Sequence, residues 1–278
     1  MKPLSLALII AYCLLPLAPR AQTLPNSLNA GGSFYKMGMR VYHLSDDSTE
    51  EAVQLFTKAI ENGQDVAGSY MMRGACKGIL KQYMLAIDDL NASKLLDSSY
   101  SKLYYYYGDV YLREGMNLMA LHYFDIAISM DSTNPEYYNS RAIVECFHLE
   151  YDKVVRDENK AISLDTTNED YFVNRGYATM RLNKFDKAIE DFTHSMRIQE
   201  TQRAFANRGY SYAQLGKYEQ AITDYSRSLR FVMDGQVLCL RGIAYEALGK
   251  KQEACEDFKK SADMNYKPAL NELEKNCK

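Results

Sequence analysis

The chain has 278 residues, 47% of them hydrophobic and 25% charged, with a formal net charge of −3 at pH 7. This nearly balanced charge argues against binding to nucleic acid or to an anionic membrane surface. The hydrophobic content is ample for a continuous core. The low numbers of Pro (6) and Gly (15) suggest an organisation more uniform than two ordinary domains.

Residues 1–21 are predicted to be an export signal. Lys2 provides a short basic start, the stretch from Leu4 to Leu17 is mainly apolar, and polar sequence follows at once from Gln22. The apolar run is shorter than the roughly 20 residues that span a bilayer, although an uncleaved membrane anchor is the alternative interpretation. Cleavage near Ala21 would make the mature protein secreted or periplasmic.

No lipid anchor is predicted at Cys13, because this cysteine follows the bulky Tyr12 inside the apolar run. Residues 22–33 are rich in Asn, Ser and Gly, and we expect them to be a flexible lead-in to the folded part of the chain.

One amphipathic helix recurs along the chain. Six segments, beginning with YMMRGACKGI and ending with LCLRGIAYEA, carry a small residue at the same place, and the steps between these residues are 34, 34, 34, 33 and 33. Such a period is the signature of a repeat architecture. The small residues are Gly74, Gly108, Ala142, Gly176, Gly209 and Gly242.

A second helix follows each of these first helices. It is marked by a small residue four positions before an aromatic or apolar one, again at steps of 33–34. The pairs are Ala52/Phe56, Ala86/Leu90, Ala120/Phe124, Ala188/Phe192, Ala221/Tyr225 and Ala254/Phe258, with Val154/Glu158 in the fourth place. Two helices of about a dozen residues cannot bury their apolar faces alone, so each pair is expected to stack on the next.

The turns between the helices agree with this reading. Gly115, Asn183, Gly216 and Gly249 stand where a first helix must end in a left-handed conformation. Asn134 followed by Pro135 supplies an N-cap and a first helical residue.

The pattern resembles the tetratricopeptide repeat family, through its 34-residue period, its first-helix glycine with a tyrosine three positions later, and its Ala-x-x-x-Phe/Tyr second helix. The resemblance covers residues 34–265 and implies an all-α, right-handed superhelical solenoid of about seven helix-turn-helix repeats. Residues 266–278 are expected to form a C-terminal capping helix with a polar outward face.

Two repeats depart from the pattern. The fourth carries Val154 and Glu158 where the small and aromatic residues belong, and the first has Met39 or Arg40 in place of the glycine, with one extra residue in its loop at 43–51. We expect irregular curvature or partner contacts there, and the first repeat is alternatively a cap.

A disulfide is predicted between Cys255 and Cys277. These residues lie 11 positions before and 11 after the turn near Tyr266, at the same level of two antiparallel helices. Cys239 lies six residues off the level of Cys255, roughly 9 Å, which exceeds the reach of a disulfide. We expect Cys76, Cys146 and Cys239 to pack as small apolar side chains.

No constellation points to catalysis. The four histidines have no His or Cys partner at ligand spacing, and no phosphate-binding loop or nucleophile motif occurs, so an enzyme, a metal site and a cofactor are not predicted. The acidic pairs Asp88-Asp89 and Glu190-Asp191 are expected to face solvent.

The resemblance implies that the first helices line a concave groove. Asn174 and Asn207 recur there in identical Asn-Arg-Gly segments, and an amide side chain can both donate to and accept from a peptide main chain. Neighbouring tyrosines add stiff contact area. This arrangement is similar to the asparagine ladders of some family members, although solvated asparagines are the alternative. The predicted peptide-binding residues are Tyr105, Tyr106, Asn139, Asn174, Tyr177, Asn207 and Tyr210.

The sequence therefore favours an exported, non-enzymatic protein that binds a peptide or a protein surface in its groove. The lysines and arginine of a clamp for acidic C-terminal tails are absent, because Val173, Tyr177, Ala206 and Leu240 occupy those places. The alternative is a scaffold subunit of a cell-envelope assembly that uses its convex face or its ends. The partner's identity is not encoded in these features.

Overall fold

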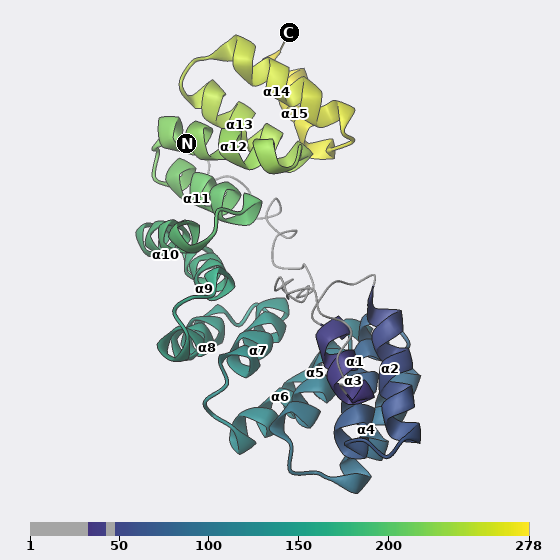
Figure 1. Ribbon diagram of the computed structural model, residues 1–278. Coiled ribbons are helices and arrows are strands. Elements are labelled where there is room, and N and C mark those ends of the chain that lie inside the picture. Colours follow the sequence, from purple (N-terminus) through teal and green to yellow (C-terminus); the bar gives the residue numbers. More distant parts are fainter. Residues whose placement is uncertain (1–32, 43–47, 278) are drawn as a thin grey trace. The chain divides into compact units, whose positions relative to one another are not determined.

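The computed structural model describes residues 33–42 and 48–277, and every regular element within them is an α-helix (Figure 1). The predicted export signal and nearly all of the predicted lead-in lie outside the described residues. The described residues fall into two compact units, an N-terminal unit that ends at Val144 and a C-terminal unit that begins at Glu145.

The fifteen helices of the described residues form seven consecutive pairs and one final helix. The N-terminal unit contains α1 (Phe34–Tyr42), α2 (Thr49–Glu61), α3 (Val66–Ile79), α4 (Tyr83–Leu96), α5 (Ser101–Glu114) and α6 (Asn117–Met130). The unit boundary lies within α7 (Pro135–Phe147). The C-terminal unit continues with α8 (Tyr151–Leu164), α9 (Glu169–Arg181), α10 (Phe185–Ile198), α11 (Gln202–Gln214), α12 (Tyr218–Phe231), α13 (Gly235–Ala247), α14 (Lys251–Asp263) and α15 (Lys267–Asn276).

Within each unit the pairs stack in a regular way. A second helix packs on its own first helix and on the first helix of the next pair, as α4 does on α3 and α5 and as α10 does on α9 and α11. The first helices of consecutive pairs also pack on each other, as α3 does on α5 and α9 does on α11. The stack therefore buries the apolar faces that a single pair would leave exposed.

The small residues of the first helices make room for the aromatic residues of the second helices. A Cβ atom added at Gly108 would lie 2.5 Å from the Phe124 ring, and one added at Gly242 would lie 2.6 Å from the Phe258 ring. Both rings are fully buried. Gly176 and Gly209 meet the rings of Phe192 and Tyr225 in the same way.

The first repeat corrects one expectation. Its buried first-helix glycine is Gly38, not a position occupied by Met39 or Arg40, because a Cβ atom at Gly38 would lie 2.8 Å from the Phe56 ring. Glycine and ring are 18 positions apart here (56 − 38) but 16 apart at Gly108 and Phe124 (124 − 108). The first repeat thus has two extra residues rather than one.

The first helices end as the turn residues predicted, in the left-handed conformation. The φ angle is +86° at Gly115 and +59° at Asn183, and it is also positive at the corresponding glycines of the two following turns. Lys81 and Leu149 occupy the same place in repeats two and four, with φ angles of +59° and +60°. A residue with a Cβ atom is strained in this conformation.

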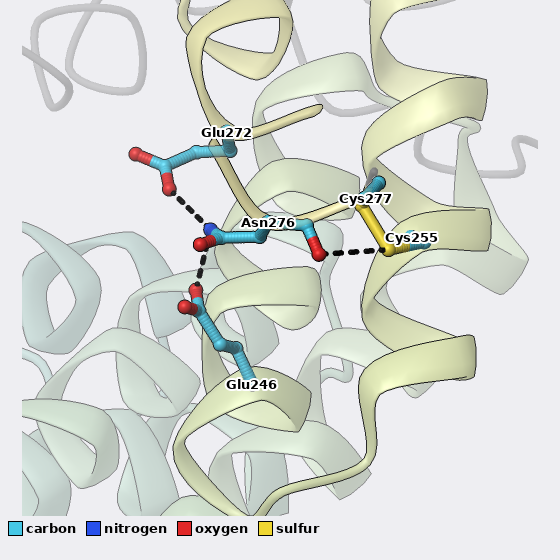
Figure 2. Close-up of a disulfide and its surroundings, with 5 residues drawn as sticks. All are labelled: Glu246, Cys255, Glu272, Asn276 and Cys277. Carbon is cyan, nitrogen blue, oxygen red and sulfur yellow. Dashed lines mark hydrogen bonds between the residues drawn. A yellow bond between two sulfur atoms is a disulfide. The ribbon is translucent and has the colours of Figure 1, made fainter. Parts of the chain in front are cut away.

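The predicted disulfide is present, and it joins the last two helices (Figure 2). The Cα atoms of Cys255 and Cys277 are 5.6 Å apart. Beside the bridge, the Nδ2 atom of Asn276 donates to Glu246 and to Glu272, each at 3.0 Å. These bonds tie the end of α15 to α13, so α15 covers the end of the stack as a capping helix should.

The remaining cysteines of the described residues are buried, as expected. Burial raises the pKa of the Cys76 thiol and of the Cys239 thiol to about 12, which keeps both protonated at neutral pH. Among the described residues, none of the helices has the length and apolar character needed to cross a membrane.

Candidate functional site

The predicted peptide-binding residues of the C-terminal unit lie on α9 and α11, which pack side by side. Both helices begin with a side-chain cap: Asn168 accepts a hydrogen bond from the N–H of Asp170, and Thr201 accepts one from the N–H of Ala204. Such caps satisfy backbone donors that have no partner within the helix and fix where the helix starts. The positions of Asn174 and Asn207 follow from these starts.

Asn174 is engaged on both sides of its amide group. Its Nδ2 atom donates to Oε1 of Glu158 at 3.2 Å, and its Oδ1 atom accepts from Nη2 of Arg203 at 3.0 Å. Arg203 also lies 3.5 Å from the carboxylate of Asp170. Asn174 therefore acts as a bridge between α8, α9 and α11.

Asn207, the second asparagine of the predicted ladder, is bonded differently. Its side chain is buried, and its Nδ2 atom has no hydrogen-bond partner among the described residues. The Nε atom of Arg203 on the same helix is likewise buried without such a partner. A buried donor without an acceptor is costly, so this part of α11 is suited to receive a carbonyl or carboxylate oxygen.

Two tyrosines accompany the asparagines. Tyr177 and Tyr210 are 4% and 7% exposed, so each presents only a small part of its ring. The hydroxyl oxygen of Tyr177 accepts from Nη1 of Arg181 at 2.9 Å, and this guanidinium also lies over the ring of Tyr151 at 4.9 Å. Burial raises the pKa of Tyr210, and the nearby Arg181 opposes this shift.

The other three predicted residues belong to the N-terminal unit. Tyr106 and Asn139 are 9% and 2% exposed, whereas Tyr105 is partly buried. The Tyr105 ring stacks on Tyr137 at 5.2 Å and meets the edge of Tyr106 at 5.4 Å. The predicted set therefore divides between the two units, and only its α9 and α11 members form one described site.

A ladder of ion pairs, which the sequence patterns above did not predict, links the helices. Arg175, next to the first-helix glycine, bonds Asp191 of its own second helix at 2.6 Å and Asn159 of the preceding second helix at 2.7 Å. The arrangement occurs four times in the described residues, as Arg73/Asp89/Thr57, Arg175/Asp191/Asn159, Arg208/Asp224/Thr193 and Arg241/Asp257/Ser226. Each arginine thus links its own first helix to the second helix of its repeat and to the second helix of the preceding repeat.

This ladder overturns the expectation that both acidic pairs face solvent. Asp89 and Asp191 are only 5% and 7% exposed, although Asp88 and Glu190 are exposed as expected. The signal was in the sequence, because an Arg precedes the glycine and an Asp follows that Arg sixteen positions later in several repeats. We call each such group an arginine staple.

The third repeat replaces its staple with tyrosines. Tyr107 stands at the arginine position and Tyr123 at the aspartate position, and their rings stack at 4.7 Å. The Tyr107 hydroxyl donates to Oδ1 of Asn91 in the preceding second helix at 2.7 Å. Tyr111 extends the stack, with its ring 5.4 Å from Tyr123. In this repeat α4, α5 and α6 are thus linked without a charged side chain.

The fourth repeat buries side chains at the same two places of its second helix, but their residue types differ from those of the other repeats. Val154 and Glu158 fill the small and aromatic places, and both are buried, at 1% and 0% exposed. Burial raises the pKa of Glu158 well above its ordinary value, while the hydrogen bond from Asn174 opposes the shift. No group of three or more His, Cys, Asp or Glu side chains suited to a metal ion occurs in the part of the chain that the structure describes.

Sequence models of one family match the C-terminal unit. The tetratricopeptide repeat is recognised at residues 169–202, 203–231 and 235–268, which contain the helix pairs from α9 to α14. No curated protein matches the sequence.

Solved structures of similar fold span both units. PilW, a type IV pilus biogenesis factor, has a TM-score of 0.67 at 18% identity, over 76% of this chain and 99% of its own. YrrB has a TM-score of 0.55 at 21% identity, over 71% and 97%. A tetratricopeptide repeat protein from Parabacteroides merdae has 0.57 at 16%, over 88% and 98%. These likenesses show the fold, and the matched repeats with their helix-pair geometry identify the chain as a tetratricopeptide repeat protein.

Proposed function

We propose that this chain is an exported, non-enzymatic interaction protein that binds an extended peptide segment across α9 and α11. The observation that carries the proposal is the buried Nδ2 atom of Asn207, which has no hydrogen-bond partner among the described residues. A main-chain carbonyl oxygen of a bound segment would satisfy it, and the nearby Nε atom of Arg203 offers a second donor. The exposed parts of Tyr177 and Tyr210, on the same two helices, would add apolar contact.

The comparisons support an interaction role. YrrB is described as a tetratricopeptide repeat protein with an unusual peptide-binding site, and PilW as a pilus biogenesis factor. Both descriptions belong to those proteins, at identities of 21% and 18%. Tetratricopeptide stacks present an extended surface rather than reaction chemistry, so binding a polypeptide is the function that this fold favours.

Asn174 and Asn207 are not equally suited to a test of the proposal. Asn174→Ala would remove the bond to Glu158 as well as any contact with a ligand, so its effects on binding and folding would be mixed. Asn207→Ala removes a donor that has no described partner. It is therefore the cleaner substitution.

The test is affinity capture from the native cell envelope with the protein spanning residues 22–278, followed by mass spectrometry. Asn207→Ala should lose the captured polypeptide, whereas Asn271→Ala, an exposed asparagine on α15, should retain it. Capture that is unchanged in Asn207→Ala and in the Asn174→Ala/Asn207→Ala double variant would rule out this face. The N-terminal sequence of the exported protein tests cleavage near Ala21.

The second candidate function is a scaffold subunit that uses its outer face. One observation favours it, namely the exposed Leu and Met side chains on the second helices α4 and α6. Monomeric soluble proteins rarely expose large contiguous apolar patches without a function.

A further inference from the structure

Among the described residues, the second helices of repeats two and three differ from the other second helices by exposing apolar side chains near their N-terminal ends. Met84 on α4 and Leu118 on α6, at equivalent places 34 positions apart, are 81% and 75% exposed. Leu85 and Met119 follow them and are 51% and 36% exposed. The other second helices have polar or charged residues at these two places: Glu50-Glu51, Asp152-Lys153, Asp186-Lys187, Glu219-Gln220 and Gln252-Glu253.

The apolar character continues to the far end of both helices. Leu95 and Leu96 on α4 are 89% and 58% exposed, and Met130 on α6 is 43% exposed. Eleven residues make just over three whole turns, so residues 84 and 95 lie on the same side of α4, roughly 16 Å apart along its axis. α4 therefore carries an outward stripe with apolar ends, and α6 has exposed apolar residues near both of its ends. We call these two stripes together the outer Leu/Met face.

The two stripes belong to one surface. Tyr107 of α5 lies between the two helices, because it bonds Asn91 of α4 and stacks on Tyr123 of α6. The helices are equivalent members of successive repeats, so their stripes run in the same direction.

We propose that the outer Leu/Met face is the interface with a second copy of this chain, packed antiparallel about a twofold axis. An axis that crosses α4 at Leu90 places Met84 of one copy against residue 96 of the other. The equivalent level of α6 is Phe124, and there the same axis places Leu118 against residue 130 of the second copy. One axis thus brings the apolar start of each helix to the level of the apolar end of the same helix in the other copy, as an isologous interface requires.

The polar middle of each stripe is complementary under the same axis. Asp88 and Asn91 are exposed in the middle of α4, and the axis places Asp88 of one copy at the level of residue 92 of the other, about 1.5 Å from the level of Asn91. The Oδ1 atom of Asn91 already accepts from Tyr107, which leaves its Nδ2 atom to donate to that carboxylate.

The middle of α6 behaves in the same way. His122 and Asp125 are exposed there, and the axis places His122 of one copy at the level of residue 126 of the other, about 1.5 Å from the level of Asp125. Asp125 is already held by Arg141 at 2.7 Å, so the two Asp125 carboxylates are partly neutralised where they approach. A single axis therefore pairs acceptor with donor in both stripes and sets no unneutralised like charges against each other.

The size of the face also fits a dimer. The seven exposed Leu and Met side chains offer roughly 800 Å² of accessible surface, about what each partner buries in a standard protein interface. These side chains carry no charge, which matches the depletion of charged residues at interface cores. An anionic membrane is less suited, because Lys94 is the only basic residue on α4 or α6.

Sedimentation equilibrium of residues 22–278 at concentrations up to about 100 μM tests the proposal. The wild type is expected to be dimeric, and Leu95→Glu/Leu118→Glu is expected to sediment as a monomer with an unchanged helical circular dichroism spectrum. Leu270→Glu, at an exposed leucine of α15, should remain dimeric. A monomeric wild type overturns the proposal, whether or not the protein binds phosphatidylcholine vesicles or a heterologous helix through this face.

The register is tested separately by crosslinking. Protein with Leu85→Cys is mixed with differently tagged protein carrying Leu95→Cys and treated with a short bismaleimide. The antiparallel register predicts a mixed product and little product from either protein alone, because residues 85 of the two copies are about 15 Å apart in axial level. The native Cys76, Cys146 and Cys239 are buried and serve as an internal background. Crosslinks formed mainly between identical variants would exclude this axis.

Discussion

The Oε1 atom of Glu158 accepts a hydrogen bond from the Nδ2 atom of Asn174 at 3.2 Å, in a place where other repeats bury a leucine or an aromatic side chain. The second carboxylate oxygen of Glu158 is buried without a hydrogen-bond partner among the described residues. A buried carboxylate that is only partly bonded favours its neutral form. The fourth repeat therefore carries a polar group at a cost to the stability of the C-terminal unit.

Glu158→Gln should stabilise the protein at pH 8 by about 1–2 kcal/mol, since the amide keeps the acceptor for Asn174 and bears no charge. The folded-state pKa of Glu158 is raised above its ordinary value of 4.5. The contribution of Glu158 to the stability of the fold is therefore greatest below pH 4.5 and is lost as the pH rises through the folded-state pKa. Thermal unfolding from pH 4 to 8 should show a difference that grows with pH. Glu190→Gln, at an exposed position of α10, should show none, and a variant less stable than wild type at pH 8 would contradict the prediction.

Exchange of the Tyr107–Tyr123 pair for an arginine staple should reveal strong coupling. Tyr107→Arg alone introduces a guanidinium without its carboxylate at a buried position and should destabilise the N-terminal unit by about 3 kcal/mol. Tyr107→Arg/Tyr123→Asp should recover much of this loss, because Arg73 and Asp89 occupy the same two places in repeat two. Thermal unfolding of both single variants and the double variant gives the coupling energy, which should exceed about 1 kcal/mol. Additive effects would show that the two positions do not communicate.

The parts of this molecule that depend on regular spacing could be predicted from its sequence. The left-handed turn at Gly115 and the Cys255–Cys277 bridge follow from the repeat period and from helix rise, and both are present. Asp191 was wrongly predicted to face solvent, because its partner Arg175 lies sixteen positions away on another helix. Adjacent charges on one helix do not reveal such a partner.

The candidate site was harder to predict for the same reason. Asn174 and Asn207 stand in identical Asn-Arg-Gly segments, yet Asn174 alone meets a buried glutamate on the preceding helix. That difference arises from Glu158, sixteen positions upstream, and not from either local motif. Identical motifs in a repeat protein can therefore have different bonding.

Glycine at the strained turn positions should stabilise the protein. Lys81 and Leu149 have positive φ angles at places that Gly115 and Gly216 fill in other repeats. Lys81→Gly and Leu149→Gly should each add about 1 kcal/mol, because relief of the left-handed strain outweighs the added freedom of the unfolded chain. Thermal unfolding measures the gain. Lys160→Gly, inside α8 at an exposed position, should instead lower stability by about 1 kcal/mol, and a loss at both turns would refute the strain argument.

Opening the disulfide should release the C-terminal cap. Cys255 and Cys277 close a loop with a sequence separation of 22, and such a bridge contributes about 3 kcal/mol by restricting the unfolded chain. Cys255→Ala/Cys277→Ala should therefore unfold at a lower temperature, and amide hydrogen exchange should accelerate in α15 before it does in α9. Dithiothreitol should lower the unfolding temperature of the wild type but not that of the variant. If reduction leaves exchange in α15 unchanged, the bonds from Asn276 to Glu246 and Glu272 hold the cap without the bridge.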